Sequence, residues 1–344
     1  MKKQTKKRVV VTGGAGYIGS HIVIELLKSN YDVIVIDSLE RGYKDAIKRT
    51  EILSGKKVKF IEVDLKDRGK IHEAFKALND VSYVIHLAAY KNVGEGEKLP
   101  VKYWENNVLA TRNLLEEIKE KKIKRIIFSS SCTVYGIPQK LPLDEDCPTI
   151  PISVYGKTKL QAEQLIDFYS QEFGIEAISL RYFNAVGCHE SGWIGEDSKK
   201  SGIFMLVPAV LDCAIGKRNK VYLFGNNFST KDGTQERDYV DVNDLAVAHR
   251  LSLEYKLSKN RMEVFNLSTG KPTSCLEIFK ICESVTGKKI NIEVTEPRQG
   301  DPLVLFAKSV RAKEKLGWSP TVSLETSIRN QWKWVIMNPN GYKE

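Results

Sequence analysis

The sequence predicts an α/β fold: a Rossmann-type doubly wound parallel sheet followed by a smaller C-terminal α/β lobe. The first observation is a series of short runs rich in β-branched residues, separated by longer polar segments with helical periodicity. The second is that these runs are continuously apolar, as in a parallel sheet with helices on both faces. The runs span residues 8–12, 32–37, 58–64, 82–89, 124–130 and 176–182.

The third observation is a change of pattern beyond about residue 184. Loops rich in Gly, Asn and Asp replace the regular alternation, and residues 190–202 are the most loop-like part of the interior. A strand at 221–225 and amphipathic stretches at 274–286 and 323–336 then indicate a second, smaller lobe. We therefore place the boundary at residue 184 and expect some crossing of the chain between the lobes.

Composition and charge exclude several classes of protein. Hydrophobic residues make up 42% of the 344 positions, which is enough for a substantial core. The formal net charge is +10, but five positive residues (positions 2, 3, 6, 7 and 8) precede the first apolar run. Because no later basic cluster with interleaved aromatic residues continues that surface, we expect no nucleic-acid partner.

The sequence also predicts a cytoplasmic protein without a membrane segment. No apolar stretch reaches the length of about 18 residues that a spanning helix needs, and Thr12-Gly13-Gly14 interrupts the first apolar run. The six cysteines form no CxxC pair and have no histidine partners at metal-binding spacing. We therefore expect neither disulfides nor a metal site, as is usual in a reducing compartment.

A glycine-rich turn joins the first strand to the helix that follows it. Gly13, Gly16 and Gly19 are spaced by three, which is a weak signal when taken alone. A dinucleotide site needs a sharp turn, a close approach of backbone to the diphosphate, and a helix whose N–H groups point at that charge. The order of strand, glycines and helix supplies all three requirements.

An acidic residue ends the second strand at the position that such a site requires. Asp37 can accept hydrogen bonds from the ribose diol of adenosine and repel a 2′-phosphate, so we predict NAD rather than NADP. Asp64 and Leu65 at the end of the third strand are placed to meet the adenine. The alternative is a glycine-rich turn with a surface Asp37, and an Asp64 that only caps a helix.

Tyr155 and Lys159 lie four residues apart in a predicted helix, so their side chains share one helix face. The fifth strand ends at Ser131 and Thr133, about two dozen residues before Tyr155, and brings two hydroxyl groups to the same edge of the sheet. We expect Lys159 to lower the pKa of Tyr155 from its ordinary value of about 10, so that the phenol can act as a base. Without the upstream cofactor site, such a pair would more often be ordinary helix surface.

Several motifs together carry a resemblance to a known family. They read VTGGAGYIGSH, SSSCTVYG, YGKTKLQAE, LRYFNAVGCHESGWIGED, RDYVDVNDLA, NLSTGKPTS and NPNGY. In these motifs the chain resembles the UDP-glucose 4-epimerases, a family of the extended short-chain dehydrogenase/reductase superfamily. Related dehydratases and decarboxylases carry acidic residues where Cys132 and Thr133 stand, so the resemblance favours epimerisation.

The resemblance implies an NAD-dependent isomerase that interconverts UDP-galactose and UDP-glucose. Tyr155 would take the proton of the sugar O4 hydroxyl while hydride leaves C4, and hydride would return to the other face of a transient 4-keto sugar. Ser131 would bind the C4 oxygen with support from Thr133, and Lys159 would hold the nicotinamide ribose. Residues 1–184 would then be the NAD-binding domain and residues 185–344 the sugar-nucleotide lobe.

The resemblance and the residue patterns together give three sets of candidate site residues. The catalytic set is Ser131, Thr133, Tyr155 and Lys159. The cofactor set is Gly13, Gly16, Tyr17, Ile18, Gly19, Asp37, Asp64, Leu65, Leu87, Ala88, Ala89, Lys91, Asn107, Ser131, Tyr155, Lys159 and Tyr182. The substrate set is Lys91, Ser131, Tyr155, Phe183, Asn184, Leu206, Phe224, Arg237, Arg298, Asp301 and Leu305.

Departures from the family pattern leave alternatives open. Met205 replaces an asparagine amide that helps hold the diphosphate, and Leu305 replaces a Tyr or Cys beside the sugar. The alternatives are a 4-epimerase of UDP-N-acetylhexosamines or UDP-uronic acids and, from a different class, a non-catalytic NAD-binding regulatory protein. The resemblance also implies a homodimer.

Overall fold

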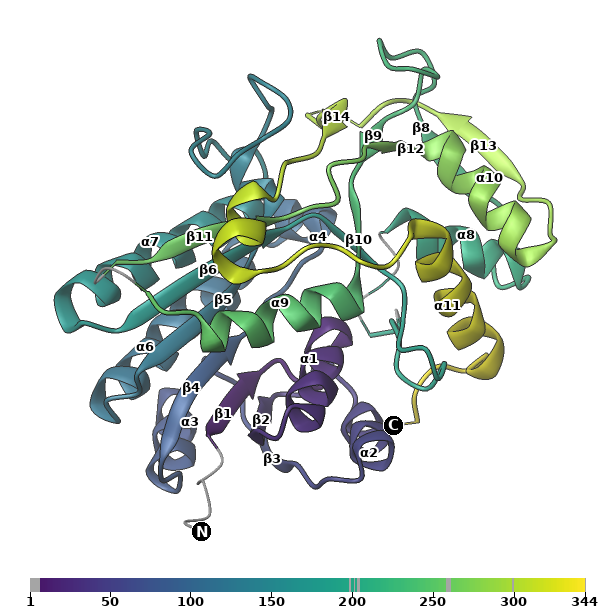
Figure 1. Ribbon diagram of the computed structural model, residues 1–344. Helices are drawn as coiled ribbons and strands as arrows, with labels where there is room; N and C mark the ends of the chain where they lie inside the picture. The colour runs from purple at the N-terminus through teal and green to yellow at the C-terminus, as the bar shows by residue number, and fades with distance from the viewer. Residues whose placement is uncertain are drawn as a thin grey trace.

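The computed structural model describes residues 7–197, 199–200, 202, 205–257, 261–298 and 300–343, so the first three lysines of the basic N-terminal segment lie outside it. A seven-stranded sheet forms its centre, in the order β11-β6-β5-β4-β1-β2-β3, with every neighbouring pair parallel (Figure 1). The predicted fold class is confirmed. The strands are β1 Arg8–Thr12, β2 Asp32–Asp37, β3 Lys59–Glu62, β4 Val81–His86, β5 Arg125–Ser131, β6 Glu176–Tyr182 and β11 Glu263–Leu267.

Helices cover both faces of this sheet because its strands are apolar on both sides. In β1, Val9 and Val11 belong to one buried cluster and Val10 to another, as the alternation of side chains along a strand requires. The first cluster contains residues of α1 (Tyr17–Lys28), α2 (Lys44–Ser54) and α9 (Val242–Glu254). The second contains residues of α3 (Arg68–Lys76), α6 (Ala110–Glu120) and α7 (Val154–Phe173).

Short helical segments follow the carboxyl ends of two strands. After β4 the chain forms α4 (Val93–Lys98), α5 (Pro100–Trp104) and the π-helical turn η1 (Glu105–Leu109), which continues into α6. After β5 it forms the 3-10 turn η2 (Cys132–Tyr135). These segments lie at the edge of the sheet where ligands bind in open α/β folds.

The C-terminal part of the chain builds a second region with its own core, in which Val210, Phe279 and Trp334 are buried together. The predicted strand at 221–225 and both predicted amphipathic helices are present, and the described part of residues 190–202 contains only turns and bends. The elements are β7 Asn184–Val186, α8 Leu206–Ala214, β8 Val221–Phe224, β9 Glu236–Arg237, β10 Tyr239–Asp241, β12 Thr273–Ser274, α10 Cys275–Thr286, β13 Ile292–Thr295, β14 Val304–Leu305, η3 Ala312–Leu316 and α11 Leu324–Met337.

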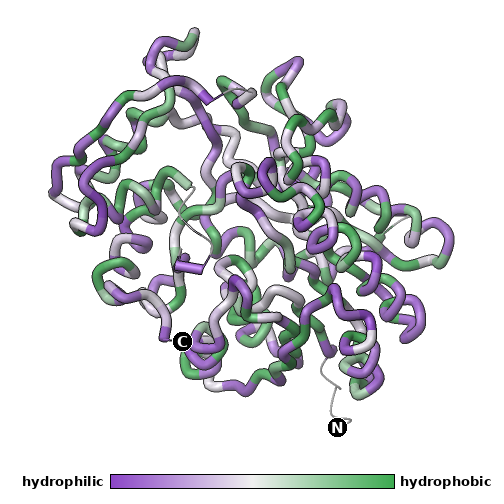
Figure 2. Tube along the Cα trace, turned by 180° about the vertical axis from the view of Figure 1, so that it is seen from behind, coloured by the Kyte–Doolittle hydropathy of each residue, from purple (hydrophilic) through white to green (hydrophobic). Residues whose placement is uncertain are grey.

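The chain crosses back from this region to the central sheet. Helix α9 packs against α1, and β11 pairs with β6 in parallel register from Glu263↔Ile178 to Leu267↔Tyr182. The last strand of the sheet therefore comes from beyond residue 184, as the expected crossing allows, and the division at 184 stays a prediction. In Figure 2, hydrophobic and hydrophilic colours alternate along the outer helical coils of the chain. Among the described residues, no helix has the length and apolarity needed to span a membrane.

Candidate active site

Two glycines of the predicted turn are required by close packing. Gly13 has φ +74°, and a Cβ atom there would lie 2.7 Å from the backbone nitrogen of Ala88. A Cβ on Gly19 would lie 2.1 Å from the carbonyl oxygen of Gly13. Both contacts are too short for any side chain, so Gly19 lets α1 approach the turn after β1, and Gly13 lets that turn approach the segment after β4. No described side chain caps the first N–H groups of α1 after Gly16, which leaves them available to a diphosphate.

Asp37 is held at the end of β2 by two backbone N–H groups. Its Oδ2 accepts from Ala15 at 3.0 Å and its Oδ1 from Leu39 at 2.9 Å. Burial raises the pKa of Asp37, and these two hydrogen bonds act in the opposite direction. Nearby Arg41 forms a bidentate ion pair with Glu95 at 2.7 and 2.8 Å, so its charge is already matched. A carboxylate at the ribose position fits NAD better than NADP.

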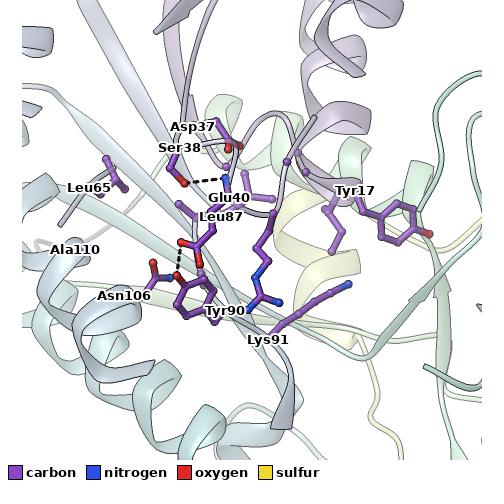
Figure 3. Close-up of a pocket in the computed structure, with 18 of the residues that line it drawn as sticks. Tyr17, Asp37, Ser38, Glu40, Leu65, Leu87, Tyr90, Lys91, Asn106 and Ala110 are labelled. Carbon is purple, nitrogen blue, oxygen red and sulfur yellow. Dashed lines mark hydrogen bonds between the residues drawn. The ribbon is translucent and has the colours of Figure 1, made fainter. Parts of the chain in front are cut away.

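A cleft runs along the carboxyl edge of the sheet from this turn to Tyr155 (Figure 3). About 1310 Å³ of space lies in the cleft and at its mouth, open solvent included. Most of the predicted cofactor residues line it. These are Gly13, Gly16, Tyr17, Ile18, Gly19, Asp37, Asp64, Leu65, Leu87, Ala88, Ala89, Lys91, Tyr155, Lys159 and Tyr182.

Asn107 differs from its predicted place beside the cofactor. Its side chain is 2% exposed, accepts from the N–H of Tyr90 at 2.8 Å, and donates to the Tyr90 carbonyl and the Thr158 hydroxyl, each at 3.0 Å. The amide thus ties the loop after β4 to α7 from behind the cleft wall. Its neighbour Asn106 is the residue that lines the cleft, because the π-helical turn directs that side chain outward.

Sequence reasoning missed part of the cleft wall. Several of these residues directly follow β2 and β4, a position that marks them as ligand contacts in this fold. The phenol of Tyr90 donates to Glu40, and Lys91 forms an ion pair with Glu196 at 2.7 Å, which brings the 190–202 segment to the cleft. The missed residues are Ile36, Ser38, Glu40, Arg41, Gly42, Val63, Tyr90, Asn92, Asn106, Ala110, Glu196 and Asp197.

The predicted catalytic residues meet at one end of the cleft. Ser131 ends β5, and its Oγ accepts hydrogen bonds from the Thr133 hydroxyl at 3.0 Å and the Thr133 N–H at 3.2 Å. Tyr155 lies in the first turn of α7, which Ser153 caps, and its phenol lies close enough to Ser131 for that side chain to act on its pKa. Thr133 therefore fixes Ser131 near Tyr155; Tyr155 lines the cleft, whereas Ser131, also predicted as a cofactor contact, is not among its lining residues.

The prediction that Lys159 lowers the pKa of Tyr155 is wrong for the chain by itself. Burial raises the pKa of Tyr155 well above 10, with smaller contributions from the neighbouring Tyr182 and Cys132, and only the hydrogen bond with Ser131 opposes them. Burial also lowers the pKa of Lys159 to about 7, although Glu163 raises it. Lys159 Nζ donates to the carbonyl oxygen of Ser129 at 2.7 Å, so its hydrogen bond goes to β5 and not to the phenol.

This lowered pKa predicts a specific pH dependence of stability. Between pH 7 and about 10 the unfolded chain keeps the proton on Lys159, whereas the folded chain loses it. The free-energy cost of burying Lys159 therefore falls as pH rises, and the free energy of unfolding of the wild type increases. We expect Lys159→Met to be more stable than the wild type at pH 7 and to lose that advantage by up to about 1.4 kcal/mol per pH unit. Urea denaturation of both proteins without cofactor measures this, and parallel pH curves would contradict it.

Two predicted substrate residues are brought together by a small sheet. Leu305 in β14 is the register partner of Arg237 in β9, so two residues far apart in the sequence lie side by side. The neighbouring Asp238 turns away and accepts hydrogen bonds from residues 268–270, so it does not neutralise Arg237. Leu305 is 6% exposed and packs in the same buried cluster as Cys132 and Phe183, next to Ser131.

The two predicted diphosphate-binding arginines both act on the pKa of one buried thiol. Arg237, Arg298 and Asp301 all act electrostatically on the thiol of Cys275, and Arg237 also acts on Cys132 at the cleft end. Among the described residues, neither arginine has a carboxylate within 4.0 Å. The guanidinium of Arg298 instead lies 3.7 Å from the ring centroid of Phe224. Two cations without anionic partners suit a doubly charged phosphate ligand.

The remaining substrate candidates surround this region. Asn184 begins β7 and donates its backbone N–H to the Asp238 carbonyl at 3.1 Å, while Phe183 is buried. Leu206 is the first residue of α8, and Met205 before it offers no side-chain cap to that helix. Met205 therefore offers no polar side chain in place of the asparagine expected from the family pattern.

Comparison with known proteins agrees with this geometry. The profile of the NAD dependent epimerase/dehydratase family matches residues 9–268. The chain belongs to this family. A curated member, the UDP-glucose 4-epimerase of Bacillus subtilis (strain 168), is 42% identical over 337 residues, which cover 97% of this chain and 98% of that protein.

Solved structures of the epimerase/dehydratase family have the same fold. The UDP-glucose 4-epimerase of Bifidobacterium longum, in complex with NAD+ and UDP, has a TM-score of 0.93 and 39% identity, covering 98% of this chain and 100% of that one. The UDP-Glc/GlcNAc 4-epimerase of Campylobacter jejuni has a TM-score of 0.83 and 32% identity, covering 96% and 99%.

Proposed function

We propose that this protein catalyses the reversible epimerisation of UDP-galactose and UDP-glucose at C4, using bound NAD that each cycle restores. The observation that carries the proposal is the pairing of Tyr155 with Ser131 at the cleft end, beside a residue that is neither acid nor base. Burial raises the pKa of the Cys132 thiol to about 12, so it stays protonated at neutral pH. The site can therefore move one hydroxyl proton and one hydride, which is all that epimerisation needs.

The residues of the cleft end divide this chemistry among them. Tyr155 is the group placed to accept the proton of the O4 hydroxyl and return it, which requires ligand binding to lower the pKa that burial raises in the chain by itself. Ser131 hydrogen-bonds the C4 oxygen while Thr133 holds Ser131 in place. NAD, when bound, supplies the hydride acceptor. Lys159 is positioned at the cofactor side of the phenol by its bond to β5. The 4-keto sugar must turn between hydride removal and return. We therefore expect the protein to hold the substrate mainly through its UDP group and not through the sugar.

The UDP group is assigned to the C-terminal region. Arg237 and Arg298 are cations without carboxylate partners among the described residues, and they are placed to bind the diphosphate. Asp301 is assigned to the ribose of uridine. The charge of Arg237 acts on both Cys132, beside Ser131, and Cys275, on which Arg298 also acts, so a sugar diphosphate held by the two arginines would place its sugar toward Tyr155.

Incubation of the purified protein with UDP-galactose tests the function. We expect UDP-glucose to form without added cofactor, because Asp37 and the glycine turn hold NAD through purification. Chromatography of the supernatant after denaturation should then show NAD in near-equal amount to protein. A content of mainly NADP, or a stoichiometric requirement for NADPH, would contradict the proposal, and absence of turnover would favour a non-catalytic NAD-binding protein.

We assign the discrimination between different UDP-sugars to Leu305. Leucine leaves more space than tyrosine but offers no hydrogen bond to an acetamido group, so discrimination of only about 1–3 kcal/mol is expected. We infer that UDP-galactose is the preferred substrate and UDP-N-acetylgalactosamine a poorer one. Comparing kcat/KM for both, with a UDP-uronic acid as a third substrate, separates this from the alternative epimerases, since a preference for either other sugar would support the alternative.

We also infer a homodimer and a cytoplasmic location. Val101 and Trp104 in α5, and Phe168 and Phe173 on α7, are 68%, 44%, 54% and 48% exposed. Large exposed apolar side chains of this kind favour association with a second copy. The six cysteines are free thiols, as expected in a reducing compartment. Sedimentation analysis and cell fractionation test the two inferences, and a monomer or a secreted protein would contradict them.

A further inference from the structure

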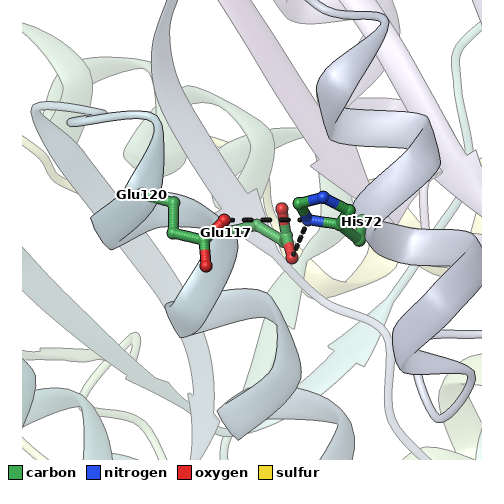
Figure 4. Close-up of side chains that lie close together, drawn as sticks. All are labelled: His72, Glu117 and Glu120. Carbon is green, nitrogen blue, oxygen red and sulfur yellow. Dashed lines mark hydrogen bonds and ion pairs between the residues drawn. The ribbon is translucent and has the colours of Figure 1, made fainter.

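Three side chains that could bind a metal ion meet outside the cleft, on the face of the sheet covered by α3 and α6. His72 projects from α3, and Glu117 and Glu120 project from α6 (Figure 4). Glu117 and Glu120 lie one turn apart on α6, and His72 faces them from α3, so the three side chains point toward one another. None of them lines the cleft, and none has a part in the proposed reaction.

The distances between these groups leave room for a bound ion as well as for direct ion pairs. His72 Nδ1 lies 3.3 Å from Glu117 Oε1 and 3.7 Å from Glu120 Oε2, and one ligand atom from each residue lies within 4.8 Å of the others. A good N–H···O hydrogen bond is shorter, with a typical length of about 2.9–3.0 Å. A tetrahedral zinc ion with bonds of 2.0–2.1 Å separates neighbouring ligand atoms by about 3.3–3.4 Å.

An independent observation is the unsatisfied carboxylate of Glu117. The residue is 3% exposed, and its Oε2 is buried without a hydrogen-bond partner among the described residues. Outside the cluster, no described side chain bonds either of its oxygens. Leaving a buried carboxylate oxygen without a donor or a cation is costly, and buried polar atoms in folded proteins are rarely left in this state. A cation between Glu117, His72 and Glu120 would satisfy it.

We propose that His72, Glu117 and Glu120 bind a zinc ion, with the fourth ligand position open to water. One imidazole and two carboxylates suit Zn²⁺, whereas Mg²⁺ and Ca²⁺ take six or more ligands, mostly oxygens. The side chains of His72 and Glu120 are 50% and 48% exposed, so the ion can enter from solvent and keep a water ligand.

The ion would join α3 to α6 and thereby support the wall of the cleft. Helix α6 begins at Ala110, which lines the cleft, and Asn113 one turn later donates to the carbonyl of Leu65 at 3.0 Å. The role of the site is therefore structural and lies on the side of the cleft assigned to adenine. It is independent of the assignment of the substrate.

Titration calorimetry on the NAD-bound protein, with any affinity tag removed and metals stripped by a chelator, tests the proposal. We expect one Zn²⁺ per chain and much weaker binding of Mg²⁺. His72→Gln and Glu117→Gln should each weaken Zn²⁺ binding by at least about tenfold, the lower range for disturbed metal sites. Glu73→Gln is the matched control, because Glu73 is an exposed carboxylate next to His72 and should leave the affinity unchanged.

A second measurement separates the site from other zinc ligands on the protein. The other four histidines are at most 7% exposed, so binding by another surface imidazole is excluded. Zn²⁺ should raise the melting temperature of the wild type and of Glu73→Gln, but not of the two site variants. Failure of the wild type to bind Zn²⁺, equal binding of Mg²⁺, or full affinity in either folded site variant would overturn the proposal. If one variant does not fold, the other and Glu120→Gln decide.

Discussion

Replacing Tyr155 with phenylalanine should lower kcat by at least about 10²-fold, the lower range for loss of a positioned acid–base group. The substitution removes only the hydroxyl that bonds with Ser131, and the ring keeps its place in the first turn of α7. The protein should therefore still fold and bind NAD. Steady-state turnover of UDP-galactose, with NAD content measured on the same sample, gives the result.

Tyr169→Phe is the matched control for this variant. Tyr169 lies on the same helix and is buried, but its hydroxyl donates to Glu116 on α6 and is far along α7 from Ser131. We expect its kcat to be close to that of the wild type. Equal losses in both variants, or near wild-type turnover in Tyr155→Phe, would show that the phenol of Tyr155 is not the group that moves the proton.

Replacing Arg237 with methionine should raise the KM for UDP-galactose by at least about 30-fold, with a smaller change in kcat. Removing one partner of a desolvated charge pair costs about 2–5 kcal/mol, and about 2 kcal/mol corresponds to this factor. Methionine keeps much of the packing of the arginine stem and removes the charge. Initial rates over a range of UDP-galactose concentrations separate KM from kcat.

Arg311→Met is the control for the loss of one positive charge. Arg311 forms an exposed pair with Asp146 at 2.8 Å and does not line the cleft, so its removal should leave the KM nearly unchanged. An unchanged KM in Arg237→Met would remove this residue from the diphosphate site. A large fall in kcat at constant KM would instead show that Arg237 stabilises only the transition state and not the bound substrate.

The sequence by itself determined the features that depend on residues close together in the chain. Apolar runs of four to eight residues can form buried parallel strands only when helices cover both faces, so the run at 8–12 and its successors became β1 to β6. The turn at Gly13 and the carboxylate of Asp37 follow from local backbone geometry. The residues of the UDP-sugar region came from the resemblance to the family and not from periodicity.

Tertiary structure decided whatever depends on partners distant in the sequence. The short run 263–267 becomes a strand only because β6 offers it an edge, and Asn107 turns behind the cleft because Thr158 accepts its hydrogen bond. The spacing of four residues between Tyr155 and Lys159 predicted that the lysine lowers the pKa of the phenol. Burial in the folded chain instead lowers the pKa of Lys159 and raises that of Tyr155. Desolvation depends on everything packed around a group, so no local pattern reports it, and the same holds for the meeting of α3 and α6 that creates the His72 cluster.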